Sequence, residues 1–252
     1  MIEKQLPINK LALRIPGQSL DERLRNLADG FLRDNLLAWT VVMLTLLEWW
    51  RWYAQIKPSP LVYSLLAFVA VLFAVFRSRM YLVAMRRVKL GLDGEVAVGQ
   101  YLENLREDGY RILHDVVGKD FNIDHVLIGP AGVFTVETKT YRKPKRGDAI
   151  IEVRSDELTL NGQPLPRNPI RQCKAQAHWL REYLRECGIN IDVLPVVVFP
   201  GWFVRPHQHT QVGMWVLEPK ALPGFLRHET NRLTAQQIAS INSALSRYVR
   251  GA

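Results

Sequence analysis

A chain of 252 residues, 48% of them hydrophobic and with a formal net charge of +9, is long enough for one large domain or for one domain with an appendage. Its two cysteines, Cys173 and Cys187, fall about four turns apart in one predicted helix, which excludes a disulfide framework and fits a reducing compartment. The positive charge does not by itself indicate a nucleic-acid binder, because residues 90–252 are nearly neutral and residues 77–89 are basic without a single acid.

The first third of the chain contains two long apolar stretches. Residues 1–34 are polar and of mixed charge, and a short amphipathic helix is expected near Leu20–Leu32. Asn35 to Ala54 and Pro60 to Phe76 then reach the length of about 17–25 mainly apolar residues that a bilayer-spanning helix needs. Trp and Tyr gather at the end of the first stretch, as in an aromatic belt. We therefore predict a transmembrane helical hairpin over residues 35–76.

The distribution of Lys and Arg predicts the orientation of this hairpin. Both flanks are basic, whereas the connection carries only Arg51 and Lys57. Because short cytoplasmic loops are enriched in Lys and Arg, we expect a multi-pass membrane protein whose termini and soluble domain are cytoplasmic. Residues 77–90 form a basic juxtamembrane linker, and contact with anionic lipid is expected at five cations: Arg77, Arg79, Arg86, Arg87 and Lys89.

Two other interpretations of the apolar stretches remain open. They are compatible with two helices buried in a soluble domain, or with a hairpin that lies in the membrane interface without spanning it. Glu48, close to the end of the first stretch, favours these alternatives. A cleaved signal peptide is not expected, because residues 1–34 are mostly polar and precede the first apolar run.

Residues 91–252 are predicted to form a soluble domain with an α/β fold, in which a mixed sheet is flanked by helices. Periodicity and turn residues predict these elements in order: a helix over 93–106; strands 110–117, 123–128, 132–140, 150–154 and 158–160; a helix from 168 to 187; strands 193–199 and 214–218; and a last helix after 234. Asn168-Pro169 is a favourable helix start, and Thr234 with Gln237 forms a capping box.

One predicted strand pair gathers charged side chains on a single face. If Gly129 faces Gly132 across the turn, Asp124 lies opposite Glu137, with Cβ atoms roughly 4.5–5.5 Å apart. Two facing carboxylates repel each other unless a cation lies between them. Lys139 follows Glu137 by two residues and projects from the same face.

Two carboxylates and an ammonium on one sheet face are typical of metal-dependent phosphodiester chemistry. Asp124 and Glu137 are oxygen ligands of the kind that Mg²⁺ or Mn²⁺ prefers. Lys139 fits a cation that orients water or stabilises the transition state. Glu95, on an otherwise apolar helix stripe, is a third carboxylate that fits the metal shell. The alternative is a cross-strand salt-bridge cluster without a metal.

Asp124 followed by Glu137-x-Lys139 on a strand is similar to the PD-(D/E)xK nuclease superfamily, and the wider string resembles the nuclease-related domain (NERD) family over residues 89–200. The matching pieces are Gly91-x-x-Gly94-Glu95, Asn122-Ile123-Asp124-His125, Gly132-Val133-x-x-x-Glu137-x-Lys139 and Asn168-Pro169-x-x-Gln172. Ile123 departs from the Pro of the superfamily pattern. The resemblance implies a restriction-endonuclease-like fold, a DNA-processing role, and active-site residues Glu95, Asp124, Glu137, Lys139 and Gln172.

Other polar and aromatic groups are weighed against plainer interpretations. The basic cluster Arg142, Lys143, Lys145 and Arg146 fits a nucleic-acid backbone or, equally, a solvated loop. His125, on the face opposite Asp124, is expected to be structural. His207-Gln208-His209 lacks partners at zinc-site spacing. Trp179 and Tyr183 are expected to pack rather than to stack on bases.

The sequence therefore predicts a membrane-anchored, Mg²⁺- or Mn²⁺-dependent nuclease acting on nucleic acid, and the resemblance implies that this nucleic acid is DNA. A catalytically inactive module that binds nucleic acid or a protein partner at the membrane is the alternative, motivated by the near-neutral charge of residues 90–252. A membrane scaffold that oligomerises through its hairpin is a third hypothesis.

Overall fold

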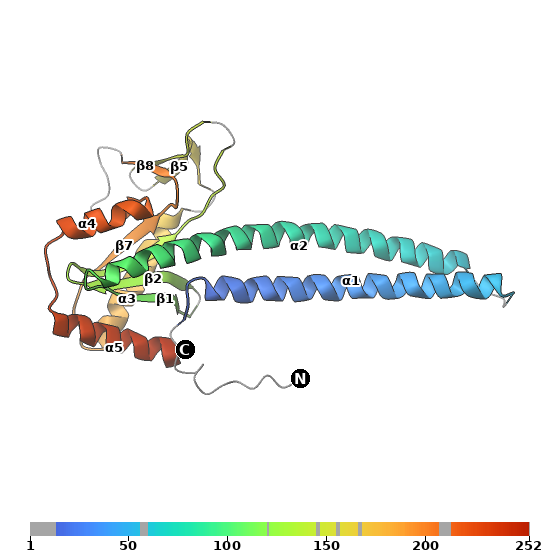
Figure 1. Cartoon of the computed structure of the whole chain (residues 1–252), viewed down its shortest axis with the longest axis horizontal. Helices are drawn as coiled ribbons and strands as arrows, with labels where there is room; N and C mark the ends of the chain where they lie inside the picture. Colours follow the sequence, from blue (N-terminus) through green and yellow to red (C-terminus); the bar gives the residue numbers. More distant parts are fainter. Residues whose placement is uncertain are drawn as a thin grey trace. The chain divides into compact units, whose positions relative to one another are not determined.

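The computed structural model describes residues 14–55, 60–119, 121–144, 147–154, 157–165, 168–206 and 213–251. The chain divides into two compact units. One unit is Ser19–Leu90, and the other is Gly91–Ala252 together with the residues up to Gln18. Figure 1 shows the first as a pair of long helices and the second as sheets covered by helices.

The first unit is a helical hairpin. Helix α1 spans Gln18–Tyr53, and helix α2 spans Pro60–Glu103, so residues 77–90 lie within a continuous helix (Figure 1). Polar side chains join the two helices along their length: Asn35 Nδ2 donates to Ser78 Oγ (3.2 Å), Thr45 Oγ1 to the Tyr63 carbonyl (2.9 Å) and Trp49 Nε1 to Ser64 Oγ (3.0 Å).

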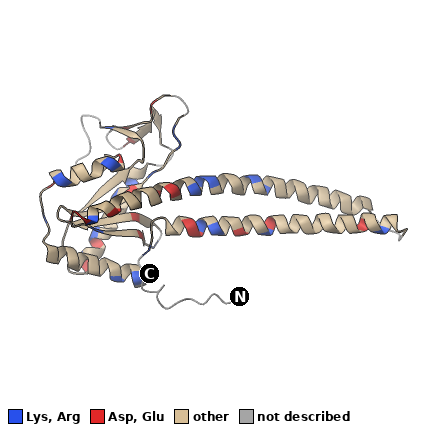
Figure 2. Ribbon diagram, viewed as in Figure 1, with Lys and Arg blue, Asp and Glu red and all other residues tan. Residues whose placement is uncertain are grey.

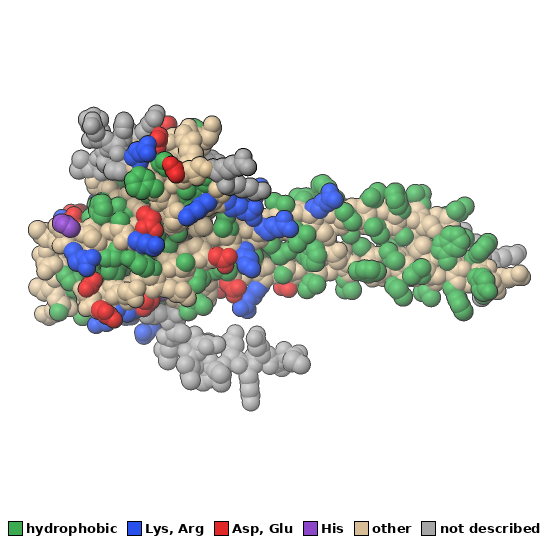
Figure 3. Space-filling view, turned by 45° about the horizontal axis from the view of Figure 1, so that its top comes forward, with side chains coloured by type: hydrophobic (Ala, Val, Ile, Leu, Met, Phe, Trp, Pro, Cys, Tyr) green, Lys and Arg blue, Asp and Glu red, His purple; other side chains and the backbone are tan. Residues whose placement is uncertain are grey.

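Both helices are long and apolar enough to cross a membrane, by length and composition. Only 6% of the most apolar 18-residue window of each helix is buried, so these side chains do not form the core of a soluble domain. Figure 3 shows the outer surface of the hairpin covered largely by apolar side chains. Lys and Arg of α2 gather on the part that follows the apolar half (Figure 2). Glu48 is 8% exposed and pairs with Arg51 at 3.0 Å.

The second unit is built on a five-stranded mixed sheet in the order β1-β2-β3-β7-β9. The antiparallel part is β1 (Arg111–Val117), β2 (Asn122–Gly129) and β3 (Gly132–Thr138), and the parallel part adds β7 (Val193–Val198) and β9 (Trp215–Leu217) beside β3. These bounds differ by one or two residues from the predicted ones. The mixed α/β fold is confirmed.

A smaller sheet has the order β6-β5-β4-β8. Its strands are β4 (Ile150–Arg154), β5 (Glu157–Leu160), β6 (Gln163–Pro164) and β8 (Phe203–Pro206), with β8 parallel to β4. The sequence did not predict β6 and β8, nor two short helical segments: η3 (Pro219–Ala221) and α4 (Leu222–His228). These elements are too short for periodicity to identify. The end of the predicted helix over 93–106 is the separate turn η2 (Asn104–Arg106).

Helices cover both faces of the large sheet. The end of α2 and α4 pack on one face, through Leu102 and Leu222 among others. Helices α3 (Pro169–Glu186) and α5 (Ala235–Gly251) pack on the other, through Leu180 and Leu245 among others. The predicted helix over 93–106 is wrong in its start, because these residues are the last turns of α2 and the turn η2.

The predicted starts of α3 and α5 are confirmed. Asn168 Oδ1 accepts a hydrogen bond from the Ile170 amide, and Thr234 and Gln237 bond reciprocally. Cys173 is buried and Cys187 exposed, and both are free thiols.

Gly94 allows helix α2 to approach the end of β3. A Cβ atom on Gly94 would lie 1.8 Å from Thr140 Oγ1, far inside van der Waals contact. The substitution Gly94→Ala must therefore push α2 away from the sheet, and we expect it to lower the free energy of unfolding by about 1–3 kcal/mol. Thermal unfolding of the full chain in detergent measures the change.

The matched control is Gly224→Ala, also in a helix, where nothing lies within 4 Å of an added Cβ. It should leave stability unchanged or raise it by up to about 1 kcal/mol, because Ala favours helix. Equal unfolding temperatures for the two variants would contradict the proposed close contact.

Candidate functional site

The pairing of β2 with β3 brings Asp124 and Glu137 together. Gly129 pairs with Gly132 and His125 with Val136, as the turn predicted, so the same register continues to Asp124 and Glu137. The backbone amide of Thr138 donates to Asp124 Oδ2 at 2.7 Å. This bond fixes the Asp124 carboxylate against the end of β3.

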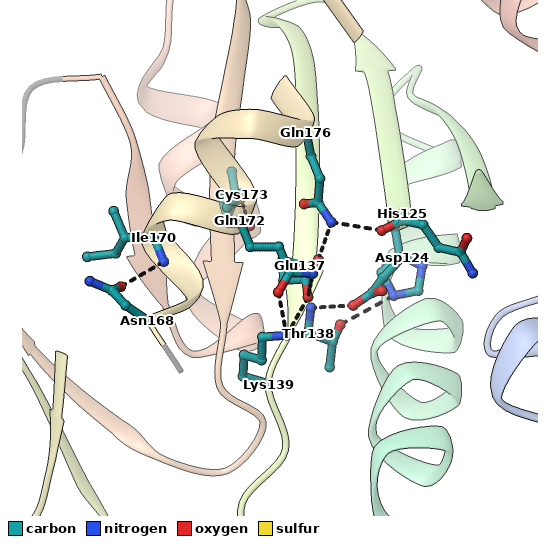
Figure 4. A network of polar contacts seen from close by, with 12 residues as sticks. Asp124, His125, Glu137, Thr138, Lys139, Asn168, Ile170, Gln172, Cys173 and Gln176 are labelled. Atoms are coloured by element: carbon teal, nitrogen blue, oxygen red, sulfur yellow. Dashed lines mark hydrogen bonds and ion pairs between the residues drawn. The ribbon is translucent and has the colours of Figure 1, made fainter. Parts of the chain in front are cut away.

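Glu137 is a buried carboxylate surrounded by donors. Its side chain is 3% exposed. Oε1 accepts from Lys139 Nζ at 2.5 Å and from Gln172 Nε2 at 2.7 Å, and Oε2 accepts from Gln176 Nε2 at 2.7 Å (Figure 4). Lys139 Nζ also donates to Gln172 Oε1 at 3.1 Å. A buried carboxylate is stable only with such partners, since its burial without them costs several kcal/mol.

Helix α3 supplies both amides. The N-cap Asn168 and Pro169 start the helix beside β3, and Gln172 and Gln176 then lie on one face, one turn apart. Sequence reasoning assigned no role to Gln176. The sequence feature that could have identified Gln176 is its position four residues after Gln172, on the same helix face. Polar residues at this spacing also occur on solvent-exposed helix faces, so the sequence alone does not distinguish the two cases.

Gln176 is 1% exposed and ties three elements together. Its Nε2 donates to the Asn122 carbonyl at 2.8 Å as well as to Glu137, so it joins α3 to β2 and β3. Its Oε1 is buried without a hydrogen-bond partner among the described residues. We infer that Gln176 is a positioning residue for Glu137.

Glu95 lies at the same end of the sheet, on the part of α2 that Gly94 brings close. Burial first, and then the charges of Glu137 and Asp115, raise the pKa of its carboxyl from 4.5 to about 8, against the opposing effect of Lys139. No direct contact joins the Glu95 carboxylate to Asp124 or Glu137 among the described residues. Glu95 is therefore an electrostatic neighbour of the pair.

The site carries more negative than positive groups. Burial, and then the charges of Glu137 and Glu95, raise the pKa of Asp124 well above its usual value. Burial lowers the pKa of Lys139, but the Glu137 carboxylate more than offsets this, so the ammonium persists. Three carboxyl groups around one ammonium form an arrangement that takes up protons or further cations.

The donor set fits a divalent cation in chemistry. Asp124 and Glu137 present carboxylate oxygens from neighbouring strands, and hard cations such as Mg²⁺ prefer oxygen ligands. Among the described residues, however, no group of three His, Cys, Asp or Glu side chains is arranged to hold a metal ion. Both oxygens of Glu137 accept hydrogen bonds, one of them from the Lys139 ammonium, and an ionised carboxylate has further lone pairs for a ligand bond.

Two buried histidines lie behind the site, on the other face of the sheet. His125 Nδ1 is 2.9 Å from His114 Nδ1, and His114 Nε2 is 2.8 Å from Glu103 Oε1. Burial and the neighbouring His114 lower the pKa of His125 to about 3, so it is neutral. His125 Nε2 lies 3.5 Å from Thr138 Oγ1, which ties this pair to the strand end that holds Asp124.

The remaining predicted groups lie elsewhere. Arg142 and Lys143 are exposed on the segment after β3, whereas Lys145 and Arg146 lie outside the described residues, as do His207-Gln208-His209. Trp179 and Tyr183 pack with Tyr248 in an aromatic cluster between α3 and α5, as predicted.

Residues 90–200 match the family model of the nuclease-related domain. This segment contains all residues of the carboxylate site: Glu95, Asp124, Glu137, Lys139, Gln172 and Gln176. Neither a curated protein nor a solved structure matches the chain.

The raised pKa of Glu95 has a consequence for stability. Because the folded state holds this proton more tightly than the unfolded chain, the stabilisation is complete below pH 4.5 and is lost as the pH rises toward about 8. Glutamine at position 95 does not titrate, so the Glu95→Gln variant does not lose this stabilisation. The free energy of unfolding of the variant, relative to that of the parent protein, should therefore be larger at pH 8.5 than at pH 5. We expect a gain on the order of 2 kcal/mol, since one pKa unit is about 1.4 kcal/mol and the group is partly exposed.

Denaturant unfolding of the metal-free protein at both pH values measures this gain. Glu107→Gln removes a carboxylate from an exposed position and is the matched control. If the difference in unfolding free energy between Glu95→Gln and the parent protein is the same at pH 5 and at pH 8.5, the pKa of the Glu95 carboxyl is not raised in the folded state.

Proposed function

We propose that this chain, whose residues 90–200 belong to the nuclease-related domain family, is a membrane-anchored, divalent-metal-dependent nuclease that hydrolyses phosphodiester bonds, with DNA as its substrate. The observation that carries the proposal is the opposition of Asp124 and Glu137 on adjacent strands, with Lys139 against Glu137. Opposed carboxylates with an adjacent ammonium are otherwise a costly way to pair two strands.

Asp124 and Glu137 would hold Mg²⁺ or Mn²⁺, with Glu95 completing the shell. When bound, such a cation supplies an activated water and neutralises charge on the phosphate. Glu137 would bind the cation through lone pairs left free on its carboxylate oxygens, and the Lys139 ammonium, 2.5 Å from Oε1, would remain beside the site. Glu95 and Asp124 must lose their protons, so cation binding releases protons near neutral pH.

The other polar side chains at the site would each have a role in the reaction. The Lys139 ammonium orients the attacking water or stabilises the oxyanion. Gln172, which is exposed and already bonded to Lys139, orients the water or the substrate. Gln176 holds the orientation of the Glu137 carboxylate through its hydrogen bond to Oε2. Arg142 and Lys143, with Lys145 and Arg146, hold the phosphate backbone beside the site.

The substitution Lys139→Ala tests this proposal. With the full chain in detergent, Mg²⁺ or Mn²⁺ and labelled DNA, we expect cleavage by the parent protein and a loss of at least about 10²-fold in the variant, because removal of one preorganised electrostatic donor costs that much. Lys119→Ala removes an exposed lysine and should cleave at the parental rate. Equal cleavage by Lys139→Ala and Lys119→Ala would refute the assignment.

A second candidate is a catalytically inactive module that binds nucleic acid or a protein partner at the membrane. The full engagement of Glu137 by Lys139, Gln172 and Gln176 favours it, since this network is satisfied without a metal. In the same experiment, such a module would bind DNA with a salt-dependent affinity. It would not cleave DNA, and its binding would not respond to Mg²⁺.

The hairpin anchors the enzyme in a membrane, with both termini and the nuclease-related domain in the cytoplasm. The low burial of its apolar windows supports this, because such a surface in water would promote aggregation. The basic residues of α2 next to the apolar part, Arg77, Arg79, Arg86, Arg87 and Lys89, fit contact with anionic lipid head groups.

A charge placed in each apolar window tests the anchor. The double substitution Val42→Arg/Val71→Arg should release the chain from membranes on alkaline extraction, because each central arginine costs about 2.5–3.5 kcal/mol. Val83→Arg lies beyond the apolar window and should not release it.

In oriented vesicles, labelling of the exposed thiol of Cys187 shows on which side of the membrane the domain lies. Cys173 does not interfere, because it is buried and its pKa is raised to about 12. Labelling of Cys187 from the external face would contradict the orientation.

A further inference from the structure

A cavity of about 950 Å³ opens in the second unit between the small sheet and the edge of the large one. Its walls come from β8, β9, η3 and α4, and from the extended segment after β3. A volume near 1,000 Å³ is at the upper end of ordinary ligand sites. The cavity does not include Asp124, Glu137 or Lys139, so it is separate from the carboxylate site.

Aromatic side chains open to solvent line the mouth of this cavity. Phe203 is 64% and Phe225 45% exposed, and they are the large apolar side chains most open to solvent among the described residues from Gly91 onward. Both line the same cavity. Such exposure costs solvation free energy in a lone domain, and apolar side chains gathered around one cavity are typical of a binding site.

The aromatic wall is held rigidly. Trp215 is stacked on Phe134 in the sheet, with ring centroids 5.3 Å apart and planes at 30°. Phe225 meets Trp215 edge to face at 5.4 Å. The Trp215 and Phe225 rings are therefore positioned before any ligand arrives, which lowers the entropic cost of stacking a planar group on them.

The rim of the cavity is basic. Lys143 and Lys220 both line it and are exposed. Glu218 is also present, but its carboxylate accepts from the Lys220 amide at 3.1 Å and caps η3. An aromatic wall with ammonium groups at the rim complements a ligand that has a planar ring and a negatively charged group close to it.

The cavity and the carboxylate site are linked by a short segment of the chain. Lys139 and Lys143 are separated by four residue steps of the segment that leaves β3, which span at most about 14 Å. A strand of nucleic acid that places one phosphate at Lys139 therefore reaches this cavity within a few nucleotides.

We infer that the cavity is a binding groove for unpaired nucleobases of a single strand of nucleic acid, with Phe203, Trp215 and Phe225 as stacking surfaces and Lys143 and Lys220 as phosphate contacts. The inference rests on the proposed function and deepens it, because it assigns a single-stranded flank to the substrate. Base stacking on aromatic side chains tolerates any sequence, since every base has a π face.

Strand binding in EDTA tests the groove without hydrolysis. The full chain in lipid nanodiscs is titrated into a fluorescein-labelled mixed-sequence oligonucleotide, an abasic oligonucleotide of equal length, and a blunt duplex. We expect the base-containing single strand to bind more tightly than the other two. The double substitution Phe203→Leu/Phe225→Leu should raise its Kd by about tenfold or more, because stacking contributes about 1–3 kcal/mol per base.

The control is Phe203→Tyr/Phe225→Tyr, which keeps both rings and should leave the Kd within about twofold of the parent. Equal Kd values for the base-containing and abasic strands, or no effect of the leucine variant, would overturn the groove. A fatty acid is the competing ligand for an apolar cavity. If the leucine variant loses binding of a fluorescent fatty acid while its binding of the oligonucleotide is unchanged, the proposed groove is also overturned.

The outcomes for the two proposals are distinguishable. Cleavage that depends on Lys139, with a leucine variant that binds normally, overturns the groove alone. Strand binding in EDTA that falls in the leucine variant supports the groove even if the parent protein never cleaves DNA, and in that case the nuclease proposal fails.

Discussion

The buried carboxylate of Glu137 is the constraint on which the rest of the second unit depends. A carboxylate that is 3% exposed, in the middle of a sheet covered on both faces, is stable only if donors surround it. Lys139 from the same strand and two amides from α3 supply them, so the start of α3 beside β3 is fixed by electrostatics as well as by packing. On the opposite side of the sheet, Gly94 allows α2 to bring Glu95 to the same strand end.

This network joins a structural task to a chemical one. The ammonium of Lys139 neutralises Glu137, and burial together with neighbouring carboxylates raises the pKa of Asp124 and of Glu95, because carboxyl groups outnumber the ammonium here. An apolar pair at these positions would join β2 to β3 more cheaply, since replacing buried ion pairs by packed hydrophobic residues is often stabilising. The stability of this network is therefore weak evidence for a purely structural role, and the excess of carboxyl groups is the feature on which the proposed cation site rests.

Most of the fold was predictable because it follows local rules. The register of β2 with β3 came from the turn between Gly129 and Gly132, and the starts of α3 and α5 from Asn168 and Thr234. The features that the sequence did not predict depend on contacts between elements that are distant in the chain. The role of Gln176 depends on where α3 crosses β3, and β8 is a short strand defined by its pairing with β4. The helix at Glu95 was predicted, but the continuity of α2 from Pro60 to Glu103 was not, because a glycine at 91 and another at 94 indicate a break.

The central claim is that Asp124 and Glu137 would hold a divalent cation beside the Lys139 ammonium. Anomalous diffraction from crystals of the full chain soaked in Mn²⁺ tests it most directly. The account predicts one anomalous peak in contact with oxygens of Asp124 and Glu137. Soaked crystals with no peak there would contradict it.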